Sequence, residues 1–343
     1  MTSLLPSKPV AADRIQLAHG GGGSLMHQLI HEDLLPLYGE SPPVLHDAAA
    51  LARPDHGIAF TTDGYVVQPL EFPGGDIGSL AVTGTANDLA MAGARPQYLS
   101  VSLILEEGLP RPLLRRVVAS MRTAALDCGV AIVTGDTKVV ERGKADGLFI
   151  STSGIGVMEA FNPIGPTALR AGDALFVSGD LGRHGLAIMA ARHGLDLQPP
   201  LLSDCAPLWP QVEALLQAGI TPHCLRDLTR GGLASALQEL AEAAVLQFRV
   251  EEAAVPVIEP VRRCCTLLGL DPFHLANEGR FLVVVPSEQR AQTLAVLHPR
   301  GGAWVGQVEE VATGMAPRVL LATELGTERL LLPPTGELLP RIC

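Results

Sequence analysis

The chain has 343 residues and a formal net charge of −11, and 47% of its residues are hydrophobic while only 18% are charged. This composition predicts packed cores in about two domains, and the negative charge without any basic run argues against a nucleic-acid partner. No apolar run approaches the roughly 18 residues of a membrane span, and residues 1–12 lack a signal-peptide pattern, so we expect a cytoplasmic protein without membrane contact.

Glycine-rich turns and short elements alternate along the first half. The run Gly20–Gly23 precedes an apolar-periodic segment, where it can wrap backbone N–H groups around an anion or serve as a flexible hinge. Asp76 follows the pair Gly74–Gly75 and should cap a helix. Strands are expected over 57–62, 65–67, 98–105, 130–134 and 148–157, and helices from 77 and over 113–125, the latter closed by Gly129.

Two groups of polar residues in this half indicate chemistry. Asn87 and Asp88 fall on the inward face of the helix that begins at 77, where a buried carboxylate needs a partner or a metal. An internal hydrogen-bonded pair is the alternative. Gly135–Lys138 follows the strand expected over 130–134, and its Asp136 and Lys138 suit Mg²⁺ and phosphate together. A capped turn with a surface ion pair would explain the same residues.

The second half repeats this style after the expected linker 162–166. Asp227, Arg230 and Gly231 precede a helix, where they form either an anion and metal cradle or a helix cap. Glu278 stands between Asn and Gly just before an apolar strand, where it faces a cleft or caps a turn. Strands are expected over 173–178, 281–285, 303–308, 318–322 and 329–332, and helices up to 193 and over 208–218, 233–241, 257–268 and 288–297.

The six cysteines form no CxxC pair and no Cys/His zinc spacing, so neither a disulfide framework nor a structural zinc is expected. Cys343 is the last residue of the sequence. A chain end is mobile unless it is tied down, and a tethered thiol reaches a nearby cleft at high effective concentration. Cys343 therefore predicts a swinging carrier of an acyl-like group, against the alternative of a frayed end with an accidental cysteine.

Both halves thus mix strands and helices, and four acids with small neighbours are distributed over them. These acids are the candidate ligands of nucleotide-bound Mg²⁺: Asp63, Asp88, Asp136 and Asp227. No Walker or dinucleotide-binding glycine motif fits its required context, so the nucleotide fold must be of another kind.

Several stretches together resemble the HypE family of hydrogenase maturation proteins, the carbamoyl dehydratases, within the superfamily of aminoimidazole ribonucleotide synthetase and selenophosphate synthetase. The resemblance covers nearly the whole chain. It is carried by HGGGGS, TDGYVVQPLEFPGGDIG, GTANDLAMAGA, ILEEG, TGDTKVV, SDCAPL, RDLTRGG, ANEG and the final LPRIC.

The resemblance implies a two-domain α/β (α+β) fold in which each domain is a mixed sheet with helices. Residues 1–163 would form the ATP-binding domain, whose sheet pairs with its copy in a homodimer, 164–332 the second domain, and 333–343 a flexible tail. It implies that a carbamoyltransferase of the HypF family loads Cys343, that ATP and Mg²⁺ drive dehydration of the carbamoyl group to a cyano group, and that HypC and HypD receive the cyanide on iron.

The resemblance also implies roles for single residues. Cys343 carries the group, and Glu278 and Lys138 hold it and relay protons, with the choice of base left open. The four acids named above bind Mg²⁺. The nucleotide would be lined by Gly21, Gly22, Asp47, Gly75, Asp76, Thr85, Asn87, Gly135, Thr137, Arg230 and Gly231.

One departure concerns Arg183, which stands where the family often has Asp, and this puts a metal or nucleotide role for its loop in doubt. Two other readings remain at this point. One is an ATP-dependent phosphotransferase of the same superfamily that acts on a free small molecule, and the other is a scaffold that binds ATP without catalysis.

Overall fold

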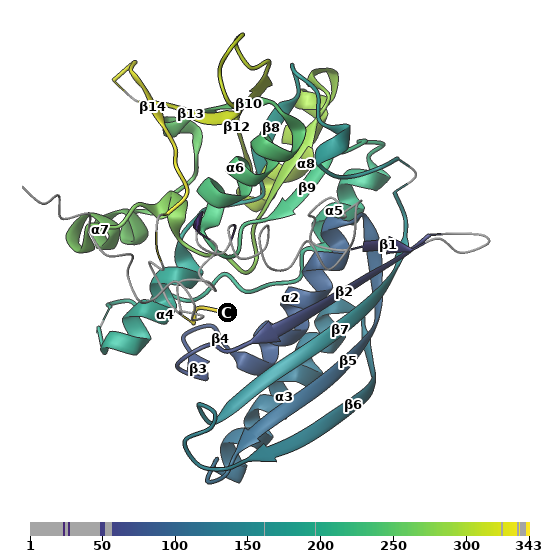
Figure 1. Ribbon diagram of the computed structural model, residues 1–343, viewed down its shortest axis with the longest axis vertical. Coiled ribbons are helices and arrows are strands. Elements are labelled where there is room, and N and C mark those ends of the chain that lie inside the picture. The colour runs from purple at the N-terminus through teal and green to yellow at the C-terminus, as the bar shows by residue number, and fades with distance from the viewer. Residues whose placement is uncertain are drawn as a thin grey trace, which may run out of the picture.

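Two mixed sheets organise the chain, one in each half (Figure 1). The computed structural model describes residues 23, 24, 27, 49–51, 57–160, 162–195, 197–323, 325–334, 336 and 341–343. The predicted site residues Gly21, Gly22 and Asp47 therefore lie outside the described residues.

The first sheet has five strands in the order β1-β2-β7-β5-β6, and only the pair β5–β6 is parallel. Helices α2 and α3 pack against one of its faces (Figure 1). The elements of this half are β1 Ala49–Leu51, β2 Ile58–Tyr65, β3 Glu71–Phe72, β4 Gly75–Asp76, α2 Ile77–Met91, β5 Ala94–Glu106, α3 Arg111–Cys128, β6 Ala131–Val140 and β7 Leu148–Met158.

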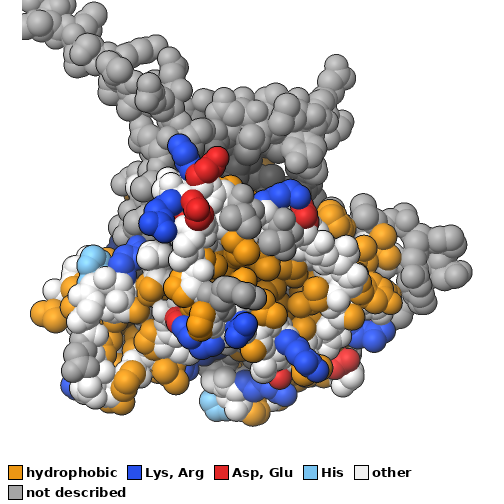
Figure 2. Space-filling model, turned by 90° about the horizontal axis from the view of Figure 1, so that it is seen from below, with side chains coloured by type: hydrophobic (Ala, Val, Ile, Leu, Met, Phe, Trp, Pro, Cys, Tyr) orange, Lys and Arg blue, Asp and Glu red, His pale blue; other side chains and the backbone are white. Residues whose placement is uncertain are grey.

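The outer face of this sheet has no helix upon it among the described residues. Phe60, Ile155 and Tyr98 are paired across β2, β7 and β5, and they are 39%, 39% and 47% exposed. A groove of about 770 Å³ between α3 and β6 adds apolar surface at the sheet edge. Figure 2 views the molecule from below, the end where this half lies in Figure 1, and shows hydrophobic side chains gathered near the centre of the view.

The second sheet has seven strands in the order β14-β13-β10-β12-β8-β11-β9, and its core lies on both faces. Its strands are β8 Ala174–Val177, β9 Cys224–Asp227, β10 Gln247–Glu251, β11 Phe281–Val285, β12 Ala303–Glu309, β13 Arg318–Ala322 and β14 Glu328–Leu330. The helices are α4 Arg183–His193, α5 Trp209–Gln217, α6 Gly232–Ala244, α7 Glu259–Leu268 and α8 Arg290–Leu297. Short 3₁₀ turns span Pro166–Ala168, Glu252–Ala254, Pro272–His274, Ser287–Gln289 and His298–Arg300.

The two halves share a core. Ile188 of α4, Ala276 and Ile342 pack into the cluster of apolar residues between the first sheet and its helices. This joins the C-terminal residues to the N-terminal half, and Figure 1 shows the chain end between the two halves, close to β4. The predicted boundary at residues 163 and 164 falls between β7 and β8 and stays a prediction.

Local signals predicted several element ends correctly, and other elements differ from the prediction. Asp76 caps α2 through hydrogen bonds from the N–H groups of Gly78 and Ser79, and Gly129 closes α3 in a left-handed conformation (φ 67°). Strand β6, however, continues through Val140, so the strand end expected at Thr134 is wrong, because this segment pairs with β5 along its whole length. Strands β1, β3, β4, β9 and β10 were not expected, and β2 ends at Tyr65, where a separate strand over 65–67 was expected.

Among the described residues, no helix is both long and apolar enough to cross a membrane.

Candidate active site

Two acids of the N-terminal half lie together between β2 and α2. Asp63 is on the face of β2 that points toward the helices, and its carboxylate accepts a hydrogen bond from the Thr85 hydroxyl at 2.8 Å. The hydroxyl of Thr61, two residues earlier on the same face, donates to the Asp88 carboxylate at 2.8 Å. The carboxyl groups of Asp88 and Asp63 also share a hydrogen bond. Burial raises the pKa of Asp63, against the lowering effects of Thr85 and nearby charge. Two carboxylates held this closely suit a shared cation.

The loop from β9 to α6 adds an acid and a cation. Asp227 is the buried last residue of β9, and Gly231 adopts a left-handed conformation (φ 72°) at the start of α6. Arg230 lies between them with its side chain exposed to solvent. The negative charges around Arg230, from Cys343 first and then from Asp63, Glu278 and Asp227, raise its pKa despite burial of part of the guanidinium.

Glu278 is the buried acid of the site. It is 3% exposed, and its Oε1 has no hydrogen-bond partner among the described residues. Burial raises its pKa well above the usual range, and Asp227, Asp204 and Asp63 raise it further, while Arg230 opposes them. A buried carboxyl with an unused oxygen is the arrangement expected of a general acid or base.

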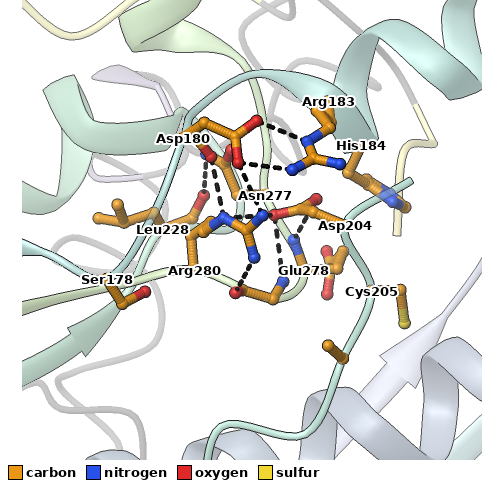
Figure 3. A network of polar contacts seen from close by, with 12 residues as sticks. Ser178, Asp180, Arg183, His184, Asp204, Cys205, Leu228, Asn277, Glu278 and Arg280 are labelled. Carbon is orange, nitrogen blue, oxygen red and sulfur yellow. Dashed lines mark hydrogen bonds and ion pairs between the residues drawn. The ribbon is translucent and has the colours of Figure 1, made fainter. Parts of the chain in front are cut away.

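A polar network behind Glu278 fixes its backbone (Figure 3). The carboxylate of Asp204 accepts hydrogen bonds from the N–H groups of Glu278 and Gly279 at 3.3 and 3.4 Å. A Cβ at position 279 would lie 1.9 Å from the Asp204 carbonyl oxygen, so only glycine fits there. Arg280 places its Nε 3.9 Å from the Asp204 carboxylate and donates from Nη2 to Asp180 at 2.9 Å.

Arg183 belongs to the same network. Its guanidinium donates to both carboxylate oxygens of Asp180, at 2.5 and 2.7 Å, so Asp180 lies between two arginines (Figure 3). The departure noted at Arg183 is therefore a structural ion pair. Local sequence patterns did not single out Asp180, Asp204 or Arg280, and only the SDCAPL stretch pointed to one of them.

Cys343 lies among these groups. The residue as a whole is partly buried, and burial of its thiol raises its pKa to about 12; Arg230 lowers the pKa, and Glu278, Asp63 and Asp227 raise it. The structure thus brings five predicted residues from four distant segments to one place. In this position Cys343 lies where a carrier thiol would react, and its carrier role stays a prediction.

The predicted residues of β6 lie elsewhere in the same chain. Asp136 and Lys138 form an ion pair at 2.9 Å and are 58% and 67% exposed. Asp136 is in register with Ser102, Ser151 and Gly64 on successive strands, so it lies about 14 Å from β2, at about 4.8 Å a strand. Side chains alternate along a strand, so Gly64 faces outward while its neighbour Asp63 faces the helices. Asp136 is in register with Gly64 and therefore also lies on the outer face.

Three further predicted nucleotide residues have structural roles. Asn87 uses its amide to join the halves, donating to the carbonyl oxygens of Ala206 and Glu278 at 3.1 Å each and accepting from the Leu208 N–H at 2.8 Å. Asp76 caps α2, and Thr85 is wholly buried against Asp63. The hydrogen bonds of Asn87 thus have backbone partners, and its contact with a nucleotide stays a prediction.

Two of the predicted nucleotide-binding glycines also lie away from the acids of the site. Gly75 packs against Phe72 and Ser79, each 3.0 Å from where its Cβ would be, and Gly135 lies on exposed β6. The side chain of Thr137 is not among those that the structure describes.

No group of three described His, Cys, Asp or Glu side chains stands ready to hold a metal ion by itself. The pair Asp63–Asp88 nevertheless fits Mg²⁺, because this ion usually takes one or two carboxylates and completes its shell with water and phosphate.

Two family models match the chain, one in each half. The family model described as AIR synthase related protein, N-terminal domain, matches residues 45–158, and the corresponding C-terminal domain matches 170–314. Carbamoyl dehydratase HypE of Rhodobacter capsulatus is 48% identical over 96% of this chain and 98% of its own. A crystal structure of hydrogenase maturation protein HypE in complex with ATP is similar, with a TM-score of 0.81 and 45% identity over 95% of this chain and 98% of the other. The crystal structure of a HypE–HypF complex matches with a TM-score of 0.83 and 39% identity, over 91% of this chain and 100% of that one.

Proposed function

This chain belongs to the HypE family of carbamoyl dehydratases, which act in hydrogenase maturation, and we propose that Cys343 carries the carbamoyl group that it dehydrates. The observation that carries the proposal is the surroundings of the Cys343 thiol. Its pKa responds to Arg230, Glu278, Asp63 and Asp227, so the sulfur lies within reach of a cation, a buried carboxyl and the candidate cation site.

The reaction converts Cys343 S–C(=O)NH2 and ATP into S–C≡N, ADP and phosphate. The carbamoyl oxygen takes the γ-phosphoryl group and leaves as phosphate, while the nitrogen loses two protons. Glu278 is the proposed base, because its Oε1 is unused; Arg230 already lowers its pKa, and Mg²⁺ bound nearby would lower it further, toward the carboxylate that accepts a proton. Closure of the site around the docked thiol keeps out water that would hydrolyse the activated group.

ATP binding is proposed for this chain from its similarity to the ATP-bound HypE structure. Asp63, Asp88 and Asp227 would hold Mg²⁺, which supplies neutralisation of phosphate charge when bound. Arg230 and the N-terminal end of α6, which has no side-chain cap, would offer positive charge to the phosphates.

A homodimer would account for Asp136 and Lys138. Both lie on the outer sheet face that carries the exposed row of Phe60, Ile155 and Tyr98, and a second copy packed there would cover that row. Asp136 and Lys138 would then belong to a site shared between copies. Light scattering tests this: Tyr98→Lys should give monomers, and Leu267→Lys, at an 84% exposed position on α7, should leave the dimer intact.

Partners follow from the same proposal. A HypF-type carbamoyltransferase would load Cys343, as the HypE–HypF complex indicates for that relative, and a HypC–HypD complex would accept the cyano group on iron.

The test is the mass of the C-terminal peptide. After incubation with the transferase, carbamoyl phosphate and ATP, the wild-type peptide should gain one carbamoyl group and then lose one water. Cys343→Ser should show neither change, and Cys205→Ser should behave as wild type. An unmodified Cys343 peptide with a phosphorylated free metabolite would instead support the phosphotransferase alternative.

A further inference from the structure

The last three residues, 341–343, which we call the docked segment, pair with the chain just beyond β2. The N–H of Gln68 donates to the Arg341 carbonyl at 3.2 Å, and the N–H of Val66 donates to the Cys343 carbonyl at 3.3 Å. This alternation is that of an antiparallel pair, so the backbone of Ile342 between them points the other way. The Ile342 side chain is only 5% exposed.

His184 occupies the position to which the Ile342 carbonyl points. Its Nε2 lies 2.8 Å from that oxygen, and its Nδ1 lies 2.8 Å from the Ser203 hydroxyl. The ring is wholly buried, and Phe72 packs edge-on against it at 5.5 Å. His184 belongs to α4 and Phe72 to β3, so both halves of the protein hold this ring.

The contacts fix the state of the imidazole. A carbonyl oxygen only accepts, so Nε2 must carry the proton that it donates to Ile342. Burial lowers the pKa of His184, against the effects of Asp204 and of the Ile342 carbonyl, and favours the neutral ring. Nδ1 then accepts from Ser203, whose oxygen in turn accepts from the Cys205 N–H at 3.1 Å.

Arg192, about two helical turns further along α4, contributes a second anchor. Its Nη2 donates to the carbonyl oxygens of Gln68 and Arg341 at 2.8 Å each, which bridges the two paired strands. All three carbonyl groups of the docked segment therefore have donors.

We propose that His184 is a positioning residue for the dehydration, and that its Nε2–H donor holds the Ile342 carbonyl so that the neighbouring Cys343 thiol stays beside Glu278 and Arg230. This inference rests on the proposed carrier role of Cys343. A carrier must also leave to be loaded. Single hydrogen bonds to backbone carbonyls suit this, because each contributes modestly and releases easily.

Alkylation of Cys343 measures how often the segment leaves. The docked thiol is buried, and burial raises its pKa to about 12, whereas a free cysteine has a pKa of about 8.5, so at pH 8 the reactive thiolate forms chiefly in undocked protein. Iodoacetamide will therefore react almost entirely with undocked protein. His184→Met removes the donor and should raise the alkylation rate about five-fold, whereas His184→Gln, which retains an amide N–H at the same reach, should stay near wild type.

Peptide masses identify the site of labelling, and the buried Cys224 must remain unlabelled in every variant as the sign of an intact fold. Ser203→Ala is a second, milder variant. It keeps the imidazole but removes the hydroxyl that fixes its tautomer, so the alkylation rate should rise by a smaller factor than in His184→Met. Single-turnover dehydration of the loaded protein should slow in His184→Met and recover in His184→Gln.

A wild-type alkylation rate in both His184→Met and Ser203→Ala would overturn the proposal, as would an equal increase in His184→Met and His184→Gln. Alkylation involves no carbamoyl chemistry. The mass experiment can therefore disprove the carrier role of Cys343 separately from the role of His184 in holding the docked segment.

Discussion

Replacing Glu278 with glutamine should stabilise the protein while it abolishes dehydration. The carboxyl is buried with an unpartnered oxygen among the described residues, and Asp227, Asp204 and Asp63 act on it with like charge. An amide cannot ionise, so it avoids the cost of holding a proton at high pH, and it offers N–H donors to these carboxylates. Since each unit by which the folded pKa exceeds the unfolded one costs about 1.4 kcal/mol at high pH, the free energy of unfolding should rise by at least about that amount at pH 8. Tm should rise by about 2–4 °C for each kcal/mol.

The gain should depend on pH. In the unfolded chain Glu278 titrates near pH 4.3, so below that pH the wild-type side chain is protonated in both states and the two proteins differ little. Above it, the unfolded state releases its proton while the raised pKa keeps the folded state protonated, so the wild type loses stability as pH rises toward the folded pKa. Urea unfolding at pH 4.5, 6 and 8, without nucleotide or divalent cation, measures this.

Glu239→Gln is the matched control with the opposite sign. Burial acts to raise the pKa of Glu239, but the charges of Arg226 and His27, at 2.6 and 3.0 Å, outweigh it and lower the pKa. The substitution should destabilise above about pH 4.5, and the loss should fade as pH falls. The reasoning is refuted if Glu278→Gln is no more stable than wild type at pH 8, or if its gain is the same at every pH.

Three other changes test separate parts of the structure. Gly279→Ala should destabilise by about 1–3 kcal/mol in urea and cut dehydration, because its Cβ meets the Asp204 carbonyl oxygen; unchanged kinetics would show that the Glu278 backbone need not be fixed. Asp76→Ala should lower the free energy of unfolding by about 1 kcal/mol through loss of the α2 cap, and a neutral result would contradict the capping role. Thr85→Val, which removes the hydroxyl on Asp63, should raise the Mg²⁺ concentration for half-maximal dehydration about 10-fold or more, whereas an unaltered Mg²⁺ titration would argue against Asp63 as a ligand.

The sequence by itself determined the elements and the chemistry that they carry. Apolar periodicity and end signals predicted α3 up to Gly129 and the start of α2 at Asp76, because these features depend on residues within a few turns. The motifs predicted the family, and the residue types predicted a thiol carrier, acids and a cation. Strand β6 was cut short and β9 was missed, because strand length depends on pairing with distant segments that no local window contains.

Only the tertiary structure decided which of the predicted residues meet. Asp63, Asp227, Glu278 and Cys343 are far apart in sequence, and the register of two sheets and the pairing of the last residues with the chain just beyond β2 bring them together. The same register puts Asp136 on the opposite face of its sheet, since side chains alternate along a strand and a pattern of polar residues does not say which face another copy covers. His184 carried no signal, because its role arises from one carbonyl oxygen 158 residues away.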